Sequence, residues 1–94
     1  MQPRYDIKQF TDIPNVGPAT ERDFILLGLT TPQELIDKDP YQLYFDLCDK
    51  TGMQQDLCVI DVFIAAVRFM QGETPHDWWY YTPERKAHFQ KIFK

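Results

Sequence analysis

The sequence is poor in residues that define several common protein classes. Its 94 residues include only two cysteines and two histidines. Two cysteines are too few for the disulfide framework of a small secreted domain, and Cys48 and Cys58 lack the paired spacing of a structural zinc site. No nucleophile stands in a recognisable catalytic setting with His76 or His88. We therefore expect no enzyme, no metal ion and no cofactor.

Long apolar runs are also missing. No run approaches the roughly 20 residues that cross a bilayer, and residues 1–6 lack the apolar stretch of a secretory signal. We therefore expect no membrane contact and a cytoplasmic location. Hydrophobic residues nevertheless make up 44% of the chain, which excludes a disordered tail. A chain of this length is expected to form a single domain over residues 1–94.

Positive charge is scarce as well. Ten lysines and arginines face 14 aspartates and glutamates, so the net charge is −4. A negative field opposes the approach of a nucleic acid. The acids are concentrated in residues 30–56, whereas cations dominate residues 82–94. Four cations from the two ends of the chain would form one surface if the first and last helices packed together: Arg4, Lys8, Arg85 and Lys86.

Strand signals are nearly absent, whereas helix starts and stops recur at short intervals. We expect an all-α fold, a compact bundle of five to six short helices. Prolines at first helical positions, a capping box at residues 31–34 and glycines after the last turns mark most of the boundaries. The expected helices cover about residues 4–10, 18–27, 32–37, 40–51, 57–70 and 82–94.

The expected helix 57–70 is apolar on almost every side, so it should be the central helix. Asp61 lies within it, and a buried carboxylate needs a partner. Arg68 is about two turns away and too far for a local pair. The partner must therefore come from elsewhere in the chain, and the indole N–H of Trp78 or Trp79 is our structural guess.

The most informative segment is TDIPNVGPAT, residues 11–20, which predicts a hairpin between two helices at about residues 13–17. Ile13 and Val16 would plug the hairpin into the core. Asn15 and Gly17 stand where the backbone must turn tightly, and Asn15 can adopt a positive φ.

Pro18 suits the first position of the helix that follows. The free N–H groups of Gly17, Ala19 and Thr20 would then point outward, at the place where helices bind anions. Arg22 is the only nearby cation, and an acidic residue flanks it on each side. A tight turn that merely packs two helices is the alternative interpretation.

The segment resembles the hairpin of the helix-hairpin-helix motif of DNA-binding proteins, which typically reads apolar-Pro-Gly-apolar-Gly-Pro, then a basic and a small residue. Asn15 stands in place of the first glycine, and Ala19 stands where a lysine or arginine usually contacts phosphate. The resemblance implies that DNA would be bound by six residues: Asn15, Val16, Gly17, Ala19, Thr20 and Arg22.

A wider resemblance covers most of the chain. Residues 47–52, 56–63 and 74–79, with Glu84-Arg85-Lys86, look like the small bacterial "pathogenicity locus" family of helix-hairpin-helix proteins. That family is similar to the C-terminal domain of competence regulators, and its members are sometimes labelled mitomycin-resistance proteins. The resemblance implies a SAM-like helical domain that associates with DNA. Ile64 stands where the family pattern has a basic residue.

Two functions follow as expectations. The first is a non-enzymatic module whose hairpin amides hold a DNA phosphate without reading the base sequence. The alternative is a protein-interaction domain on the same scaffold that has lost DNA binding. The aromatic connection at residues 78–81, which precedes the basic C-terminal helix, would mainly seal the core, with one or two rings left exposed as a protein contact. A base-stacking role for these rings is the less favoured interpretation.

Overall fold

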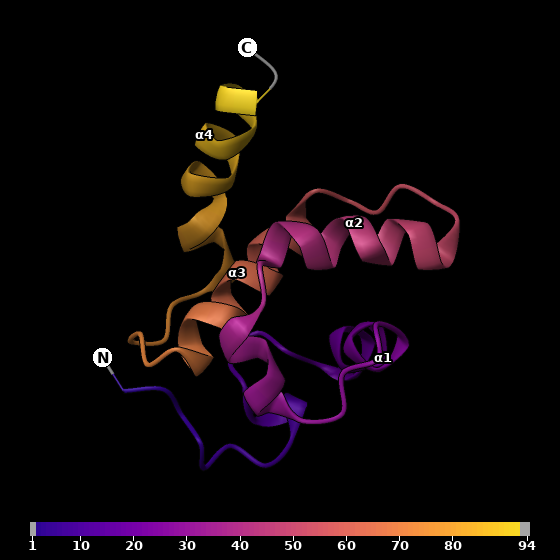
Figure 1. The fold of residues 1–94 in the computed structure, drawn as a ribbon. Coiled ribbons are helices and arrows are strands. Elements are labelled where there is room, and N and C mark those ends of the chain that lie inside the picture. The colour runs from indigo at the N-terminus through magenta and orange to yellow at the C-terminus, as the bar shows by residue number, and fades with distance from the viewer. Residues whose placement is uncertain (1, 93–94) are drawn as a thin grey trace.

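The computed structural model describes residues 2–92. Within this range it contains four α-helices, three 3₁₀-helices and no strand, which confirms the all-α prediction (Figure 1). The elements are η1 (Phe10–Asp12), α1 (Pro18–Leu26), η2 (Pro32–Asp37), α2 (Pro40–Thr51), α3 (Cys58–Met70), η3 (Trp78–Tyr81) and α4 (Thr82–Ile92).

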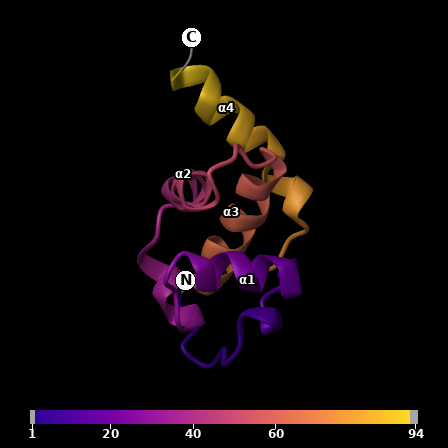
Figure 2. The same cartoon turned by 90° about the vertical axis from the view of Figure 1, so that its right-hand side faces the viewer.

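Helix α3 is the centre of the molecule, as its apolar composition predicts. Eight of its thirteen residues are buried, and it contacts α2, α4, η2 and η3. Figure 2 shows α3 between α2 and the segment that leads into α4, with α1 crossing in front. Helix α4 extends away from the rest of the molecule (Figure 1). Residues 93–94 of the expected last helix lie outside the described residues.

The helix boundaries follow local rules. Proline occupies the start of α1, η2 and α2. The Glu34 carboxylate accepts hydrogen bonds from the N–H groups of Thr30 and Thr31 at 2.6 and 2.7 Å, which confirms the capping box at the start of η2. These bonds lower the pKa of Glu34. Gly28 and Gly52 adopt positive φ angles after α1 and α2, as helix-ending glycines do.

The expected helix at residues 4–10 was wrong. Apart from the start of η1, this segment has no helix, because its backbone finds partners elsewhere. The Arg4 N–H donates to the Met70 carbonyl at 2.8 Å, and the Gln33 amide donates to the Ile7 carbonyl at 2.6 Å. Gly72, at φ +105°, lets the chain pass so closely that a Cβ there would lie 2.2 Å from the Gln2 carbonyl oxygen. Forming the first turn of a short isolated helix is unfavourable. The long-range hydrogen bonds of this segment are therefore favoured over a local helix.

Candidate functional site

Residues 13–17, the predicted hairpin, form a tight turn between η1 and α1 and do not join two α-helices, because the expected helix at residues 4–10 is absent. Ile13 and Val16 are buried, with 1% and 6% of their surfaces exposed, and the Val16 N–H donates to the Ile13 carbonyl at 3.1 Å. Asn15 lies between them at φ +71°, the only non-glycine residue with a positive φ in the described chain. Both apolar side chains therefore anchor a tight turn to the core.

The start of α1 presents unpaired backbone donors. Gly17 is the N-cap, with an extended backbone, and Pro18 is the first helical residue. Among residues 2–92, the N–H groups of Gly17, Ala19 and Thr20 have no hydrogen-bond acceptor. Pro18 and Ala19 are exposed, and a Cβ added at Gly17 would meet no atom within 4 Å. An anion can therefore approach these donors, which lie at the positive end of the helix dipole.

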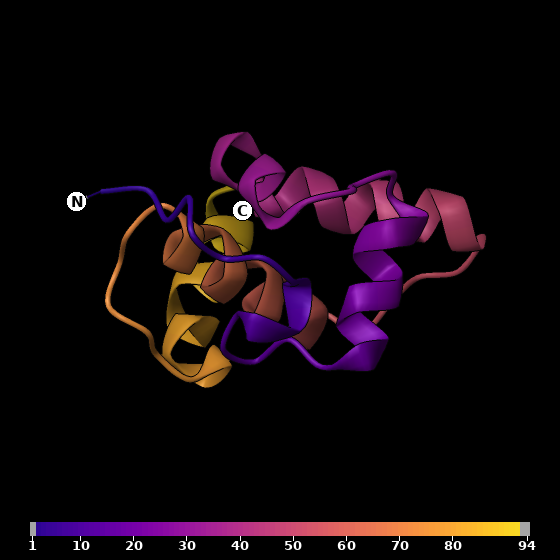
Figure 3. The ribbon, with the colours of Figure 1, turned by 90° about the horizontal axis from the view of Figure 1, so that it is seen from below.

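The side chain of Asn15 has a second role. Its amide nitrogen donates to the His76 carbonyl at 2.8 Å, and its amide oxygen accepts from the Trp78 N–H at 3.2 Å. Asn15 thus fastens the hairpin to the segment before η3. Sequence reasoning predicted the turn but missed this contact, because its partners are 61 and 63 residues away. Figure 3 shows the orange turn of residues 78–81 near the blue-violet loop that leads into α1.

Among the expected supporting cations, Arg85 is buried at 8% exposure. Its Nε and Nη2 atoms donate to the two Asp61 carboxylate oxygens at 3.0 and 3.2 Å, and the Thr82 hydroxyl donates to the same carboxylate at 2.7 Å. The bonds to Asp61 raise the pKa of Arg85. The partner of Asp61 is therefore Arg85 of α4, and our guess of a tryptophan indole was wrong.

The remaining expected cations are dispersed. The Arg4 guanidinium lies over the Phe69 ring, 4.2 Å from its centroid, and donates to the Glu73 carbonyl at 3.0 Å. Lys8 is exposed in the N-terminal segment, and Lys86 is exposed on α4. Arg22 is the exposed cation on α1 itself. The structure thus leaves the hairpin donors with little supporting charge.

Acids adjoin Arg22. Burial raises the pKa of its neighbour Asp23, and Arg22 opposes that shift. Glu21, on the other side of Arg22, is half-buried in the first turn of α1. Both carboxylates suit the helix dipole but would repel a phosphate. Affinity at this end of α1 must therefore come mainly from the backbone.

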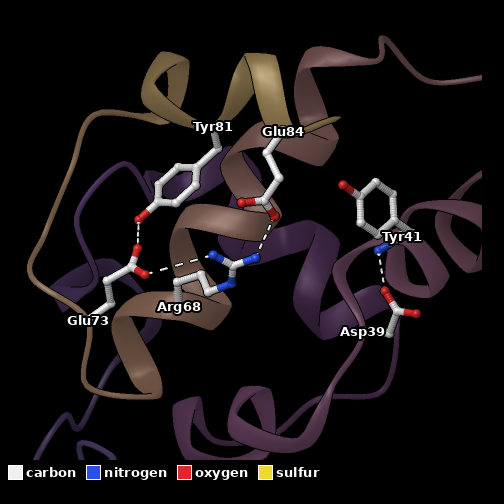
Figure 4. Close-up of polar contacts among 6 residues, drawn as sticks. All are labelled: Asp39, Tyr41, Arg68, Glu73, Tyr81 and Glu84. Atoms are coloured by element: carbon white, nitrogen blue, oxygen red, sulfur yellow. Dashed lines mark hydrogen bonds and ion pairs between the residues drawn. The ribbon is translucent and has the colours of Figure 1, made fainter. Parts of the chain in front are cut away.

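A second polar cluster joins α3 to α4 (Figure 4). Arg68 contacts the Glu84 carboxylate at 2.5 Å and the Glu73 carboxylate at 3.8 Å. The Tyr81 hydroxyl donates to Glu73, and burial together with this bond raises the pKa of Tyr81. These groups satisfy one another, so the cluster holds the start of α4 against the end of α3.

The aromatic connection is divided between core and surface. Tyr81 is buried at 3% exposure, whereas Trp79 and Tyr80 are 59% and 60% exposed. The His76 ring stacks on Tyr80, with centroids 3.9 Å apart, and Trp78 lies edge-on to Trp79 at 5.6 Å. The expectation that one or two rings would remain outside is confirmed.

A large apolar groove lies between α2, the turn that follows it, and α4. Its volume is about 810 Å³. Phe45, Met53 and Leu57 line it and are 44%, 61% and 40% exposed, and Lys86 also lines it. Sequence reasoning did not find this groove, because its walls come from three separate segments.

Two further classes of site can be assessed in residues 2–92. No helix in this range is long and apolar enough to cross a membrane. The same range contains no group of three or more histidine, cysteine, aspartate or glutamate residues that could hold a metal ion.

Similarity to known proteins extends over most of the chain. Residues 3–87 match a family model described as "pathogenicity locus". The chain is also 37% identical over 81 residues to the mitomycin resistance protein McrB of Streptomyces lavendulae, a match that spans 86% of this chain and 77% of that protein. No solved structure is significantly similar to the chain.

Proposed function

We propose that this chain, which belongs to the pathogenicity locus family, is a non-enzymatic module that holds DNA by its phosphate backbone. The observation that carries the proposal is the set of open N–H groups of Gly17, Ala19 and Thr20 at the start of α1. Backbone donors grip phosphate without contacting base edges, so binding would not depend on base sequence.

The proposed affinity is low. Most salt-dependent affinity for DNA comes from lysine and arginine contacts to phosphate. Here Ala19 replaces the cation expected from the motif, and the Arg85 guanidinium is held by Asp61. We therefore expect a dissociation constant near the weak end of non-specific binding, about 10⁻⁴ M at physiological salt.

A substitution at Gly17 tests the proposal directly. Aspartate is a favoured N-cap residue, so Gly17→Asp should fold, yet its carboxylate would occupy the proposed phosphate site. Gly17→Ala is the matched control, because the site has room for a methyl group and the φ of −101° is ordinary for alanine.

The measurement is fluorescence anisotropy of labelled single- and double-stranded DNA at low and moderate salt. We expect Gly17→Ala to bind within about twofold of the wild type and Gly17→Asp to bind at least tenfold more weakly. Absence of wild-type binding at low salt, or unchanged binding by Gly17→Asp, would overturn the proposal.

A gain of function provides an independent test. Ala19→Lys restores a cation at an exposed position beside the donors, so it should tighten binding. The plot of log affinity against log salt should also become steeper by about 0.7–0.9, the contribution of one neutralised phosphate. Ala19→Gln adds length without charge and should change neither quantity.

The apolar groove favours a second candidate function, the docking of a protein partner. Phe45, Met53 and Leu57 expose apolar surface side by side, and a flexible methionine suits an adaptable contact. Capture from a bacterial lysate would compare the wild type with a Phe45→Lys/Leu57→Lys variant. A partner retained by the wild type and lost by that variant, but kept by Gly17→Asp, would favour this function over DNA binding.

A further inference from the structure

Trp79 and Tyr80 are exposed aromatic residues in the short helix whose start is hydrogen-bonded to the hairpin. The two residues are 59% and 60% exposed, although both belong to the short helix that places Tyr81 in the core. Large rings at a surface gain most when they contact a flat apolar ligand or a partner. This pair is therefore a candidate contact surface.

The two rings are also held in place. His76 stacks on Tyr80 with an interplanar angle of 7°, and Trp78 braces Trp79 edge-on. Tyr81 anchors the same turn through its burial and its hydrogen bond to Glu73. Because the rings are already ordered, a ligand would not have to order them on binding.

The hairpin is hydrogen-bonded to the segment that carries the rings. Asn15 binds the carbonyl of His76 and the N–H of Trp78, the residues that flank the start of η3. Trp79 is the next residue in the chain after Trp78, whose N–H is bonded to Asn15. Figures 2 and 3 both show the turn of residues 78–81 on the side of the molecule where α1 begins.

We infer that Trp79 and Tyr80 stack on unpaired bases of single-stranded DNA whose backbone is held at the hairpin. The inference rests on the proposed function and specifies its ligand. Phosphate donors on the hairpin and solvent-exposed aromatic side chains in the segment bonded to it match the two parts of a nucleotide, its anion and its base, although His76 covers one face of the Tyr80 ring. A single strand offers free base faces for stacking, whereas a duplex covers these faces with neighbouring base pairs.

Two labelled ligands of equal length separate this inference from the proposed function: an oligo(dT) strand and a mixed-sequence duplex. Trp79→Ala and Tyr80→Ala should each weaken oligo(dT) binding at least fivefold and change duplex binding by less than twofold. Trp79→Phe retains a flat ring and should restore most of the affinity. Tyr5→Ala, which removes another exposed ring, is the matched control and should have no effect.

Quenching of tryptophan fluorescence is the second measurement. Oligo(dT) should quench the wild type, and the loss of quenching in Trp79→Phe would assign the signal to Trp79. If both ligands bind equally and neither ring variant changes them, this inference is wrong while the hairpin proposal stands. If the wild type binds neither ligand at low salt, both this inference and the proposed function are overturned.

Discussion

The polar groups of the hairpin differ from those of the α3–α4 junction in charge, burial and hydrogen-bond pairing. At the hairpin, the N–H groups of Gly17, Ala19 and Thr20 are neutral, accessible and unpaired. At the junction, the Asp61 carboxylate and the Arg85 guanidinium are charged, buried and paired with each other. A charge count from the sequence therefore overstates the cations available to a ligand, because this arginine is required inside the fold.

Because the polar groups of the two regions differ in burial and pairing, substitutions at the junction should mainly affect stability, and substitutions at the hairpin should mainly affect binding. Removing one partner of a buried ion pair leaves an uncompensated charge, which is costly. Altering the half-buried N-cap Gly17, where an added Cβ meets no atom within 4 Å, should have little effect on the core. We therefore expect variants at the junction to unfold the chain more readily and variants at the hairpin to change what it binds.

The largest effect is expected for Asp61→Ala, which leaves Arg85 buried without its carboxylate. The free energy of unfolding should fall by about 3–5 kcal/mol, as for other broken buried pairs. Denaturant unfolding followed by circular dichroism measures this change. The double variant Asp61→Leu/Arg85→Met removes both charges and should lose much less. A loss below about 1 kcal/mol for Asp61→Ala would mean that Arg85 reaches solvent and does not depend on its carboxylate partner.

An intermediate effect is expected for Asn15→Ala. The change removes two hydrogen bonds, each worth about 1 kcal/mol, and places alanine at a positive φ, which costs about 1 kcal/mol more. Unfolding should therefore become easier by about 2–3 kcal/mol, with faster hydrogen exchange at the Trp78 amide. Asn15→Gly removes the same bonds but tolerates the φ, so it should lose roughly 1 kcal/mol less. Equal losses in the two variants would contradict a conformational role for Asn15.

The smallest effect is expected at Glu34, which caps η2 and belongs to neither of the two regions. Its pKa is lower in the folded chain than in the unfolded chain, because the ionised carboxylate accepts the N–H bonds of Thr30 and Thr31. Ionised Glu34 therefore stabilises the fold above its unfolded pKa, and that contribution is lost as the pH falls through the folded pKa. The melting temperature of Glu34→Gln should lie slightly below that of the wild type at pH 7, and the two should converge in acid. A difference that stayed constant with pH would show that the cap does not need the charge.

Helix boundaries were predictable because their chemistry is local. Proline restricts φ at the residue that begins a helix, and Glu34 reaches the N–H groups of its own first turn. The α1 boundary was predicted at residue 27 and lies at Leu26, within the ordinary uncertainty of helix ends. The short helix η3 was not predicted, since the stacking of its rings depends on His76 and the core beneath it.

The sequence predicted the backbone conformation of the candidate site but not its side-chain contacts. The sequence pattern indicated a turn at Asn15 and a helix that begins at Pro18, and the structure has both. The pattern could not indicate that Asn15 holds the segment before η3 or that Arg85 turns inward to Asp61. Both contacts join residues more than 20 positions apart, so they depend on how the helices pack.

By itself, the sequence determined the all-α class, the family, most helix boundaries and the positive φ of Asn15, since these depend on steric limits and capping within a few residues. Tertiary structure decided the non-helical path of residues 2–9, the burial of Arg85, the exposure of Trp79 and Tyr80, and the groove beside α4. Each of these depends on which surface a distant segment covers. Only the packed chain provides that surface, because burial and long-range pairing are set by all the elements together.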